Sequence, residues 1–464
     1  MKKHSTPGRF QRPGGFDSGI SLLFLFTVST LMFPRTVFSA ELGLEDIRRA
    51  ALMASSDMRK LEIEKQNQVL EKMAHYFTYI PSLSASASAS YSPFRAAQNS
   101  ALDGLSAGAQ FSINGKISIF DRGKSKNERA NLALADSELD AQTQARLFAI
   151  LEQADSHYFN CLEAEAAIKT AELQAEISAV ALETAEIRRA GGILSPSDYF
   201  LALSNKSAAD SSLAAARTSH SLALRRLEQL IGSSGTVELL PLDFGNYEEL
   251  LNTISGWTME EISDRFLKLK EELASRSPSL KSAYITLKRA ENTYNLTKSA
   301  FLPSLDLSAS FSLDYSFIDK PPTDPLSYGA SVTLSGAIPL DYWNLINNEQ
   351  RQRNSLETSR IAYEDTLAAF DIDLQSLLFT LAGNAQTLIA NRRQAEYSAL
   401  LLEQQQELFR LSSASMTTFL DAASRSLSSE TQKTRAEFSF LRSLSALKSL
   451  GAFEDRELLG LLVE

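Results

Sequence analysis

The sequence predicts a mixed, mainly α-helical fold in which long antiparallel coiled-coil helices are combined with two β-hairpins. Residues 83–91 and 305–315 alternate strictly between apolar and polar side chains, which is the pattern of a β-strand with one apolar face. Residues 124–190 form a long run with almost no helix breaker. Both features occur twice, which indicates duplication of a whole unit rather than a short repeat.

Each alternating stretch is followed by a second one, so the chain has four predicted strands in two hairpins. The second members cover residues 105–113 and 328–338, and the loops between the strands contain proline and polar residues. About ten residues is the length at which a tilted strand crosses a bilayer. An ordinary sheet with one solvated face is the alternative. The apolar faces carry Leu83, Ala85, Ala87, Ala89 and Tyr91 in the first strand, and Leu305, Leu307, Ala309, Phe311, Leu313 and Tyr315 in the third.

Four strands cannot close a barrel, and an open sheet edge cannot lie in lipid because its backbone groups would stay unpaired. If the strands span a membrane, other copies of the chain must therefore complete the barrel. Three copies give twelve strands, which lies in the even-numbered range of outer-membrane barrels.

The helical stretches have heptad-like spacing, which favours side-by-side packing of helices. Helix 124–190, roughly 100 Å long, ends at Gly191-Gly192, and a second helix begins at Ser195-Pro196. The second unit repeats this plan with helices that run to about residue 410 and from 416 to 450. The predicted seams are Leu147, Leu151, Ala154, Tyr158 and Cys161; Leu173, Ile177, Val180, Thr184 and Ile187; and Leu367, Phe370, Leu374, Leu377 and Leu381.

The repeat sets the predicted domain organisation. Pro81 and Pro303 are related by a sequence offset of 222, whereas Ser195 and Ser415 are related by an offset of 220. The prediction places a signal peptide at 1–39, a first repeat at 40–240 and a linker or equatorial segment at 241–277. The second repeat is 278–464. The first repeat contains a β-hairpin at 80–120 and a helical hairpin at 122–231, and the second contains a β-hairpin at 302–340 and a helical hairpin at 344–450.

The N-terminus has the pattern of an export signal, with a basic leader before the apolar run 20–33. Cleavage after Ser39 or Ala40 fits this pattern, and an uncleaved anchor is the alternative. Positions 1–39 contain five basic side chains and one acidic side chain, a charge of +4. Since the whole chain has −10, the remainder has about −14. A surface this acidic disfavours nucleic acid as a partner.

The sequence offers no pattern of a catalytic, cofactor or metal site, so it predicts that the chain is not an enzyme. The one cysteine, Cys161, cannot form an internal disulfide framework. The histidines of the mature part, His75, His157 and His220, lack metal-ligand spacing. There is no G-x-S-x-G elbow and no glycine-rich phosphate loop.

Several motifs recur in the same order in both units. They are Phe-Leu-Pro-Ser-Leu at 301–305, preceded by Arg-Ser-Pro-Ser-Leu at 276–280; Ile-Phe-Asp-Arg-Gly at 119–123; and the turn 188–198. With them, the chain resembles the TolC-like outer membrane efflux protein family over essentially its whole mature length. The sequence departs from the family pattern at Ser412, where glycine is usual, at 55–57 and at 339–343.

The resemblance implies a homotrimer in which an α-helical barrel is joined to a 12-stranded transmembrane β-barrel. The trimer would lie in the cell outer membrane, in contact with its lipid, and extend into the periplasm. The implied function is that of a passive exit duct of a tripartite efflux or export system, supplied by an inner-membrane pump through a periplasmic adaptor. The alternatives are a type I protein secretion duct and, in another class, a periplasmic coiled-coil scaffold or adaptor.

The resemblance also implies two groups of functional residues at the helical tips. A periplasmic aperture would include Asp421, with Thr418, Phe409 and Asp198 at related positions. Three converging Asp421 carboxylates would attract cations; the alternative is an ordinary carboxylate on a solvated helix face. The tip turns expected to contact the adaptor contain Gly191, Gly192, Ser195, Ser412 and Ser415.

Overall fold

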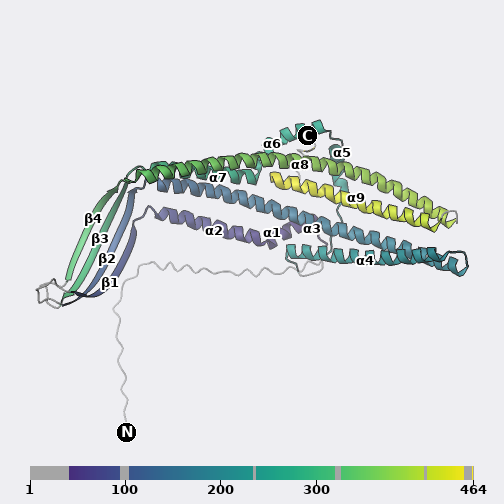
Figure 1. Cartoon of the computed structure of the whole chain (residues 1–464), viewed down its shortest axis with the longest axis horizontal. Coiled ribbons are helices and arrows are strands. Elements are labelled where there is room, and N and C mark those ends of the chain that lie inside the picture. Colours follow the sequence, from purple (N-terminus) through teal and green to yellow (C-terminus); the bar gives the residue numbers. More distant parts are fainter. Residues whose placement is uncertain are drawn as a thin grey trace, which may run out of the picture. The chain divides into compact units, whose positions relative to one another are not determined.

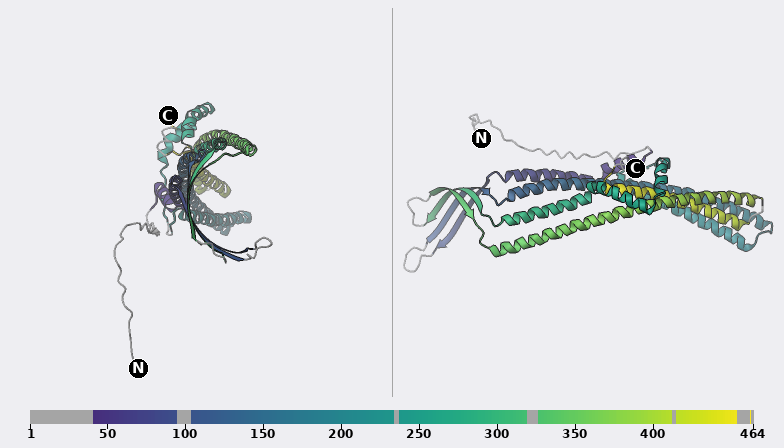
Figure 2. Two further views of the ribbon diagram at one scale, coloured as in Figure 1. Left: turned by 90° about the vertical axis from the view of Figure 1, so that its left-hand side faces the viewer. Right: turned by 90° about the horizontal axis from the view of Figure 1, so that it is seen from above.

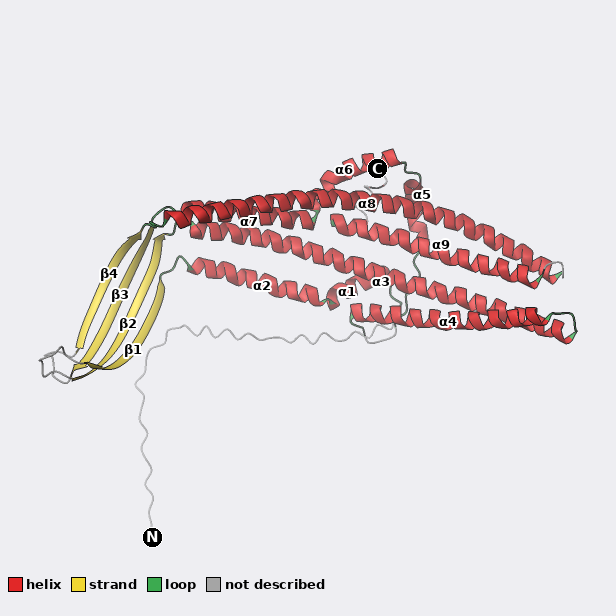
Figure 3. Cartoon of the chain, in the orientation of Figure 1, coloured by secondary structure: helices red, strands yellow, loops and turns green. Residues whose placement is uncertain are grey.

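The computed structural model describes residues 41–94, 104–233, 237–318, 326–411 and 415–453, together with residue 462. These residues belong to one unit, Val37–Glu464, in which long helices continue into one small sheet (Figures 1 and 3). The predicted signal peptide at 1–39 lies outside the described residues.

The four predicted strands form a single antiparallel sheet. The strands are β1 (Ser82–Phe94), β2 (Gly104–Phe120), β3 (Ser304–Ile318) and β4 (Leu326–Ala337). Their order in the sheet is β1-β2-β3-β4, so the hairpins of the two units are joined through β2 and β3. In the part of the chain that the structure describes, β1 and β4 are the open edges of this sheet.

The register separates an apolar from a polar face. Phe111 of β2 lies opposite Ala87 of β1 and Leu313 of β3. The next residue, Ser112, lies opposite Ser86 and Ser312. Because successive side chains of a strand point to opposite faces, the whole sheet has one polar and one apolar side, as the alternation predicts.

The helices confirm the predicted lengths. The two longest have 67 and 69 residues, which corresponds to about 100 Å each. None of the helices in the described ranges is long and apolar enough to cross a membrane. They are α1 (Leu44–Ala54), α2 (Ser56–Phe77), α3 (Lys124–Ala190), α4 (Pro196–Ile231), α5 (Glu248–Ser255), α6 (Met259–Arg276), α7 (Pro278–Ser299), α8 (Tyr342–Arg410) and α9 (Met416–Gly451).

The helices pack side by side in the same order as the strands. Near the sheet, α3 lies between α2 and α7, and α7 also packs on α8. Toward the tips, α3 lies between α4 and α9, and α9 packs on α8 (Figures 1 and 2). The helical layer therefore has α8 along one flank and α2 and α4 along the other, which continue the sheet edges at β4 and β1.

The first and last of the three predicted seams contribute to the core. The middle seam, residues 173–187, is wrong for the single chain. In the first seam Ala154, Tyr158 and Cys161 are buried, and in the last seam so are Phe370, Leu374 and Leu381. Near the first tip the buried line is instead Ser178, Ala181 and Ala185, and the predicted Leu173, Val180 and Ile187 are exposed. A straight helix drifts by about 20° per heptad against a 3.5-residue repeat, so a seam extended from one end moves off the packed face.

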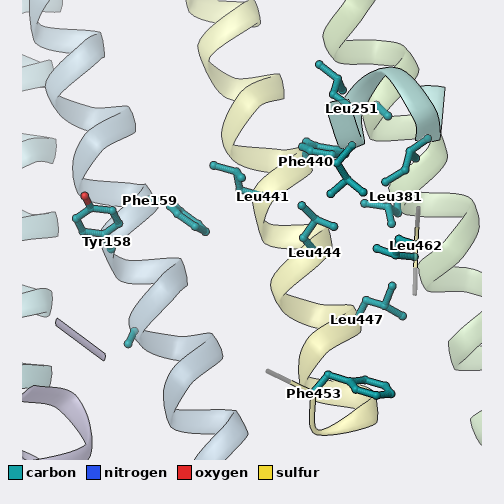
Figure 4. Packing of buried hydrophobic residues seen from close by; sticks show 14 of the residues in the cluster. Tyr158, Phe159, Leu251, Leu381, Phe440, Leu441, Leu444, Leu447, Phe453 and Leu462 are labelled. Carbon is teal, nitrogen blue, oxygen red and sulfur yellow. The ribbon is translucent and has the colours of Figure 1, made fainter. Parts of the chain in front are cut away.

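The largest part of the core lies midway along the helices. Tyr158 and Phe159 of α3, Phe440 of α9 and Leu251 of α5 belong to one cluster of buried apolar side chains (Figure 4). The Tyr158 hydroxyl donates a 2.6 Å hydrogen bond to the Leu240 carbonyl. The segment that contains α5 and α6 is thereby held against the long helices.

A buried ion pair fixes α1 to the same region. The Arg48 guanidinium donates to both carboxylate oxygens of Asp155, at 2.6 and 2.7 Å. The Ser445 hydroxyl of α9 donates to the same carboxylate at 2.7 Å. Because both charges are buried and bidentate pairing satisfies them, the interaction sets the relative positions of α1, α3 and α9.

The duplication extends to individual buried residues. At an offset of 220, Ile150, Ala154, Tyr158 and Cys161 of α3 correspond to the buried Phe370, Leu374, Leu378 and Leu381 of α8. At an offset of 222, Ile47 and Ala51 of α1 correspond to the buried Leu269 and Leu273 of α6. By this relation α6 is the counterpart of α1, and the same fold unit occurs twice in the chain.

Candidate functional site at the helical tips

The first tip is the turn between α3 and α4. The Gly191 amide donates to the Ile187 carbonyl at 3.1 Å, and the Ile193 amide donates to the Arg188 carbonyl at 3.0 Å. Gly192 has a φ of +71°, a left-handed conformation that side chains disfavour. This predicted tip glycine therefore makes the tight turn possible.

Ser195 begins α4 as its N-cap. Its hydroxyl accepts a hydrogen bond from the Asp198 amide at 3.2 Å and lies 2.8 Å from the Asp198 carboxylate. The negative charge of Asp198, in the first helical turn, also interacts favourably with the positive end of the helix dipole. Asp198 thus has a local structural role, whatever its relation to an aperture.

The second tip, between α8 and α9, has the same cap at an offset of 220. The Ser415 hydroxyl accepts a hydrogen bond from the Thr418 amide at 3.1 Å and lies 2.7 Å from the Thr418 hydroxyl. Thr418 is therefore the positional counterpart of Asp198. Ser412, predicted as part of this turn, lies outside the described residues.

Both tips contain a ring contact between the last turn of one helix and the first turn of the next. In the first tip the Arg189 guanidinium lies 4.2 Å from the centre of the Tyr199 ring. In the second, Phe409 stacks on Phe419 with 5.0 Å between ring centroids and 11° between their planes. These contacts occupy corresponding positions and hold each helical hairpin closed at its turn.

One further contact connects the two tips. The Arg188 guanidinium of α3 lies 5.2 Å from the centre of the Phe409 ring of α8. Phe409 therefore has Phe419 as a stacking partner and a cation beside its ring at the same time. Such cation–π contacts stabilise by about 0.5–1 kcal/mol at exposed sites.

Asp421 has a cationic neighbour of its own. It lies on α9 one turn before Arg425, whose Nε is 2.9 Å from the Asp421 carboxylate. Both side chains are exposed, at 63% and 68% of their full areas. The corresponding residues of α4 are Leu201 and Asn205, so the ion pair belongs to the second tip alone.

The structure thus places the predicted residues in three different settings. Thr418 and Asp198 take part in helix caps, Phe409 in a ring stack, and Asp421 in an exposed ion pair. The sequence reasoning missed Arg188, Phe419 and Arg425. The repeat offset and the four-residue spacing of Asp421 and Arg425 could have indicated the last two, but no sequence pattern indicates the contact between Arg188 and Phe409.

Two properties of the described residues concern metal binding and nucleophilic catalysis. Throughout the described part of the chain, no three or more His, Cys, Asp or Glu side chains are arranged to hold a metal ion. Burial, with a smaller effect of the Glu228 charge, raises the pKa of the Cys161 thiol to about 12. The thiol is therefore protonated at neutral pH and is a poor nucleophile.

A family model matches most of the chain. The family model described as outer membrane efflux protein matches residues 48–233 and 269–451. An uncharacterized protein of Haemophilus influenzae is 24% identical over 187 residues, which cover 39% of this chain and 40% of that protein. The chain thus matches less than half of that relative's length.

Solved structures match over most of the chain. They include CusC, described with conformational changes that accompany folding and transmembrane channel formation, at a TM-score of 0.71 and 16% identity over 89% of this chain and 93% of that one. The outer membrane protein VceC of Vibrio cholerae matches at 0.69 and 15% identity, over 88% of this chain and 96% of that one. The CmeC outer membrane channel of Campylobacter jejuni matches at 0.69 and 15% identity, over 90% and 89%. At these identities the likeness establishes the fold.

Proposed function

The chain belongs to the outer membrane efflux protein family, and from this premise we propose that it forms the outer-membrane exit duct of a tripartite export system. Three copies together form one duct that crosses the outer membrane and extends into the periplasm. The duct conducts its substrates passively and has no catalytic step. An inner-membrane pump supplies the energy, and a periplasmic adaptor connects the pump to the duct.

The observation that carries this proposal is the open, two-faced sheet. Its apolar side presents large exposed residues such as Leu83, Val332 and Leu334, and its edges β1 and β4 remain unpaired in the described chain. An apolar face fits lipid, but an open edge does not, because its backbone groups find no hydrogen-bond partners there. Pairing of β4 with β1 of another copy removes both edges, and three copies complete twelve strands.

The helices support a continuous tunnel below the barrel. Because they follow the same lateral order as the strands, closing the sheet also brings α8 of one copy beside α2 and α4 of the next. The long helices α3 and α8, about 100 Å each, then form a wall that reaches far into the periplasm.

The polar face of the sheet is suited to a water-filled passage. It is formed mainly by serines, and the charged residues on it include Lys116, Asp306 and Asp314. The Lys116 ammonium lies 3.1 Å from Asp306. Asp314 has no ion-pair partner among the described residues, so these three residues contribute a net negative charge to each copy's part of the lumen.

The tips form the periplasmic end of the duct in this proposal. Asp421 lines the aperture with Thr418, Phe409 and Asp198 nearby, and the turns with Gly191, Gly192, Ser195, Ser412 and Ser415 contact the adaptor. The neighbouring Arg425 offsets much of the Asp421 charge. The aperture is therefore less negative than three isolated carboxylates would make it.

Native mass measurement of the detergent-extracted protein tests the assembly, and single-channel recording in planar bilayers tests the duct. We expect a mass of three subunits and discrete conductance steps. A stable monomer in membranes would overturn the proposal. Deletion of the gene that encodes the chain distinguishes the two kinds of cargo. If the deletion strain becomes sensitive to small toxic compounds, the duct serves efflux. If it retains one normally secreted protein in the cell, the duct serves type I secretion.

A further inference from the structure

Inside one chain the two repeats meet where the last strand of the first unit pairs with the first strand of the second unit. Two neighbouring chains are expected to meet through the same kinds of strand. Within the chain, β2 of the first unit pairs with β3 of the second. Between chains, β4 of a second unit would pair with β1 of the next first unit. We propose that neighbouring copies contact each other in the same register, residue for residue, as the two repeats do inside one chain. This inference rests on the proposed function, because it assumes that copies of the chain close one barrel.

The observed register supplies the equivalence between the strands. Ser82 of β1 corresponds to Ser304 of β3, an offset of 222. Their partners on the following strands are Lys116 and Ala337, so β2 corresponds to β4 at an offset of 221.

These offsets convert the internal register into one between copies. Ser112 of β2 lies opposite Ser312 of β3. Thr333 is the counterpart of Ser112, and Ser90 is the counterpart of Ser312. Thr333 of one copy is therefore opposite Ser90 of the next. By the same rule the flanking pairs are Val332 with Tyr91, Leu334 with Ala89, and Ser335 with Ser88.

The derived register keeps the two faces of the sheet separate between copies, as the internal register does within one chain. It places apolar residues opposite apolar residues and polar opposite polar, whereas a shift by one residue would mix the faces. On the apolar face it sets Leu334, 60% exposed in the single chain, against the small Ala89, and Val332 against Tyr91. Large and small residues at facing positions interdigitate well.

The same rule applied to the helices gives a contact of different chemistry. Inside the chain, Arg442 of α9 donates 2.7 Å hydrogen bonds to Asn160 and Glu163 of α3. At the helical offset of 220, Arg442 corresponds to Leu222 of α4 and Glu163 to Gly383 of α8.

Both counterparts are free to make that contact. Leu222 is half exposed, and a Cβ built on Gly383 would meet no atom within 4 Å. Leu222 of one copy therefore packs over Gly383 of the next. An apolar contact on a glycine replaces the internal polar clamp.

Disulfide trapping tests the strand register. In the variant Ser90→Cys/Thr333→Cys, the two thiols lie directly opposite each other on the polar face, within the Cα separation that a disulfide spans. Mild oxidation should convert the protein to covalent trimers on a denaturing gel. The buried Cys161, with its raised pKa, should not compete.

The matched controls are Ser90→Cys/Ser335→Cys and Ser90→Cys/Ser331→Cys, which are displaced by two residues. Their Cα atoms would be about 7–8 Å apart, too far for a disulfide. If a control pair links better than the predicted pair, or if no pair links in a protein with trimeric mass, the register is overturned while the duct stands. A monomeric mass without links overturns the proposed function itself.

A charge transplant tests the helical contact. Gly383→Glu alone should lower the temperature at which the trimer dissociates, because it buries a carboxylate against Leu222. Adding Leu222→Arg should restore that temperature, since the pair then copies the clamp of Arg442 and Glu163. If the shift in dissociation temperature of the double variant equals the sum of the shifts of the two single variants, the two residues are not coupled and do not meet.

Discussion

Arg392 and Glu437 form an ion pair with 3.2 Å between Nη2 and Oε1, and the same pair occurs at an offset of 220 in the first unit with its charges exchanged, as Glu172 and Arg217 at 3.0 Å. The two pairs differ in their surroundings. Arg392 and Glu437 are 22% and 21% exposed, and the Phe244 ring lies 4.8 Å from the Arg392 guanidinium. Glu172 and Arg217 are at least half exposed. The linker that contains Phe244 thus covers one copy of the pair.

The first prediction is that Arg392→Ala destabilises the protein more than Arg217→Ala. An exposed pair is worth about 0.2–1 kcal/mol, whereas loss of hydrogen bonds to a largely buried charge costs about 1.5–3 kcal/mol. Thermal unfolding of the solubilised protein measures both. Arg392 also pairs with Glu248, at 2.7 Å, and this contact is lost in the same variant. Equal losses in both single variants would contradict the prediction.

The second prediction concerns the pH dependence of stability. Burial raises the pKa of the Glu437 carboxyl above 4.5 and outweighs the opposing charges of Lys433 and Arg392. The folded state then holds a proton that the unfolded state has lost, so this group's contribution falls as pH rises from 4.5 through the folded pKa. Glu437→Gln should flatten that part of the curve of unfolding temperature against pH. An unchanged curve would contradict the assignment.

The third prediction separates the two faces of the sheet. Phe311→Lys places a charge on the apolar face and should cost about 2–4 kcal/mol if the site lies near the middle of the membrane. Ser310→Lys, on the adjacent polar face, should be tolerated, and Leu307→Lys should repeat the result of Phe311→Lys. The yield of folded trimer in outer membranes measures these effects. Equal damage on both faces would mean that the sheet is not the wall of a barrel.

The fourth prediction concerns charge at the aperture. Asp421→Asn should weaken the preference of single channels for cations, and Asp198→Asn, which alters a helix cap, should change it less. Arg425→Ala removes the cation beside Asp421 and should therefore increase cation preference. Reversal potentials in a salt gradient measure all three variants. If Asp421→Asn and Arg425→Ala leave them unchanged, Asp421 is not at the constriction.

The fifth prediction concerns the contact between the tips. Arg188→Gln removes the cation beside Phe409. If opening separates the two hairpins, this change should increase the ratio of open to closed channels about two- to fivefold, the equivalent of about 0.5–1 kcal/mol. Arg189→Gln is the matched control, because Arg189 contacts Tyr199 within its own helical hairpin. Open probability in single-channel recordings measures both variants. A larger effect of Arg189→Gln would contradict a link between the hairpins.

Most of the fold follows from local patterns in the sequence. The period-two alternation of residues 83–91 and 305–315 predicts strands, and the structure confirms them as β1 and β3. The family match confirms the predicted family and its outer-membrane location. The domain boundaries and the roles of Asp421, Asp198 and the tip turns stay predictions. These roles depend on groups brought together across copies, which one chain's local pattern does not specify.

Local sequence patterns are enough to identify the strands, the ends of the long helices and the duplication of the unit, because alternation, glycine turns and N-caps act between residues close in the chain. Which helix faces are buried depends on how the helices pack, as with Ala181 in place of Val180, because small changes of pitch accumulate along a long helix. The contact between Arg188 and Phe409 likewise depends on this packing. That contact joins segments from different repeats, far apart in the sequence, and only the packing of α3, α9 and α8 brings them together.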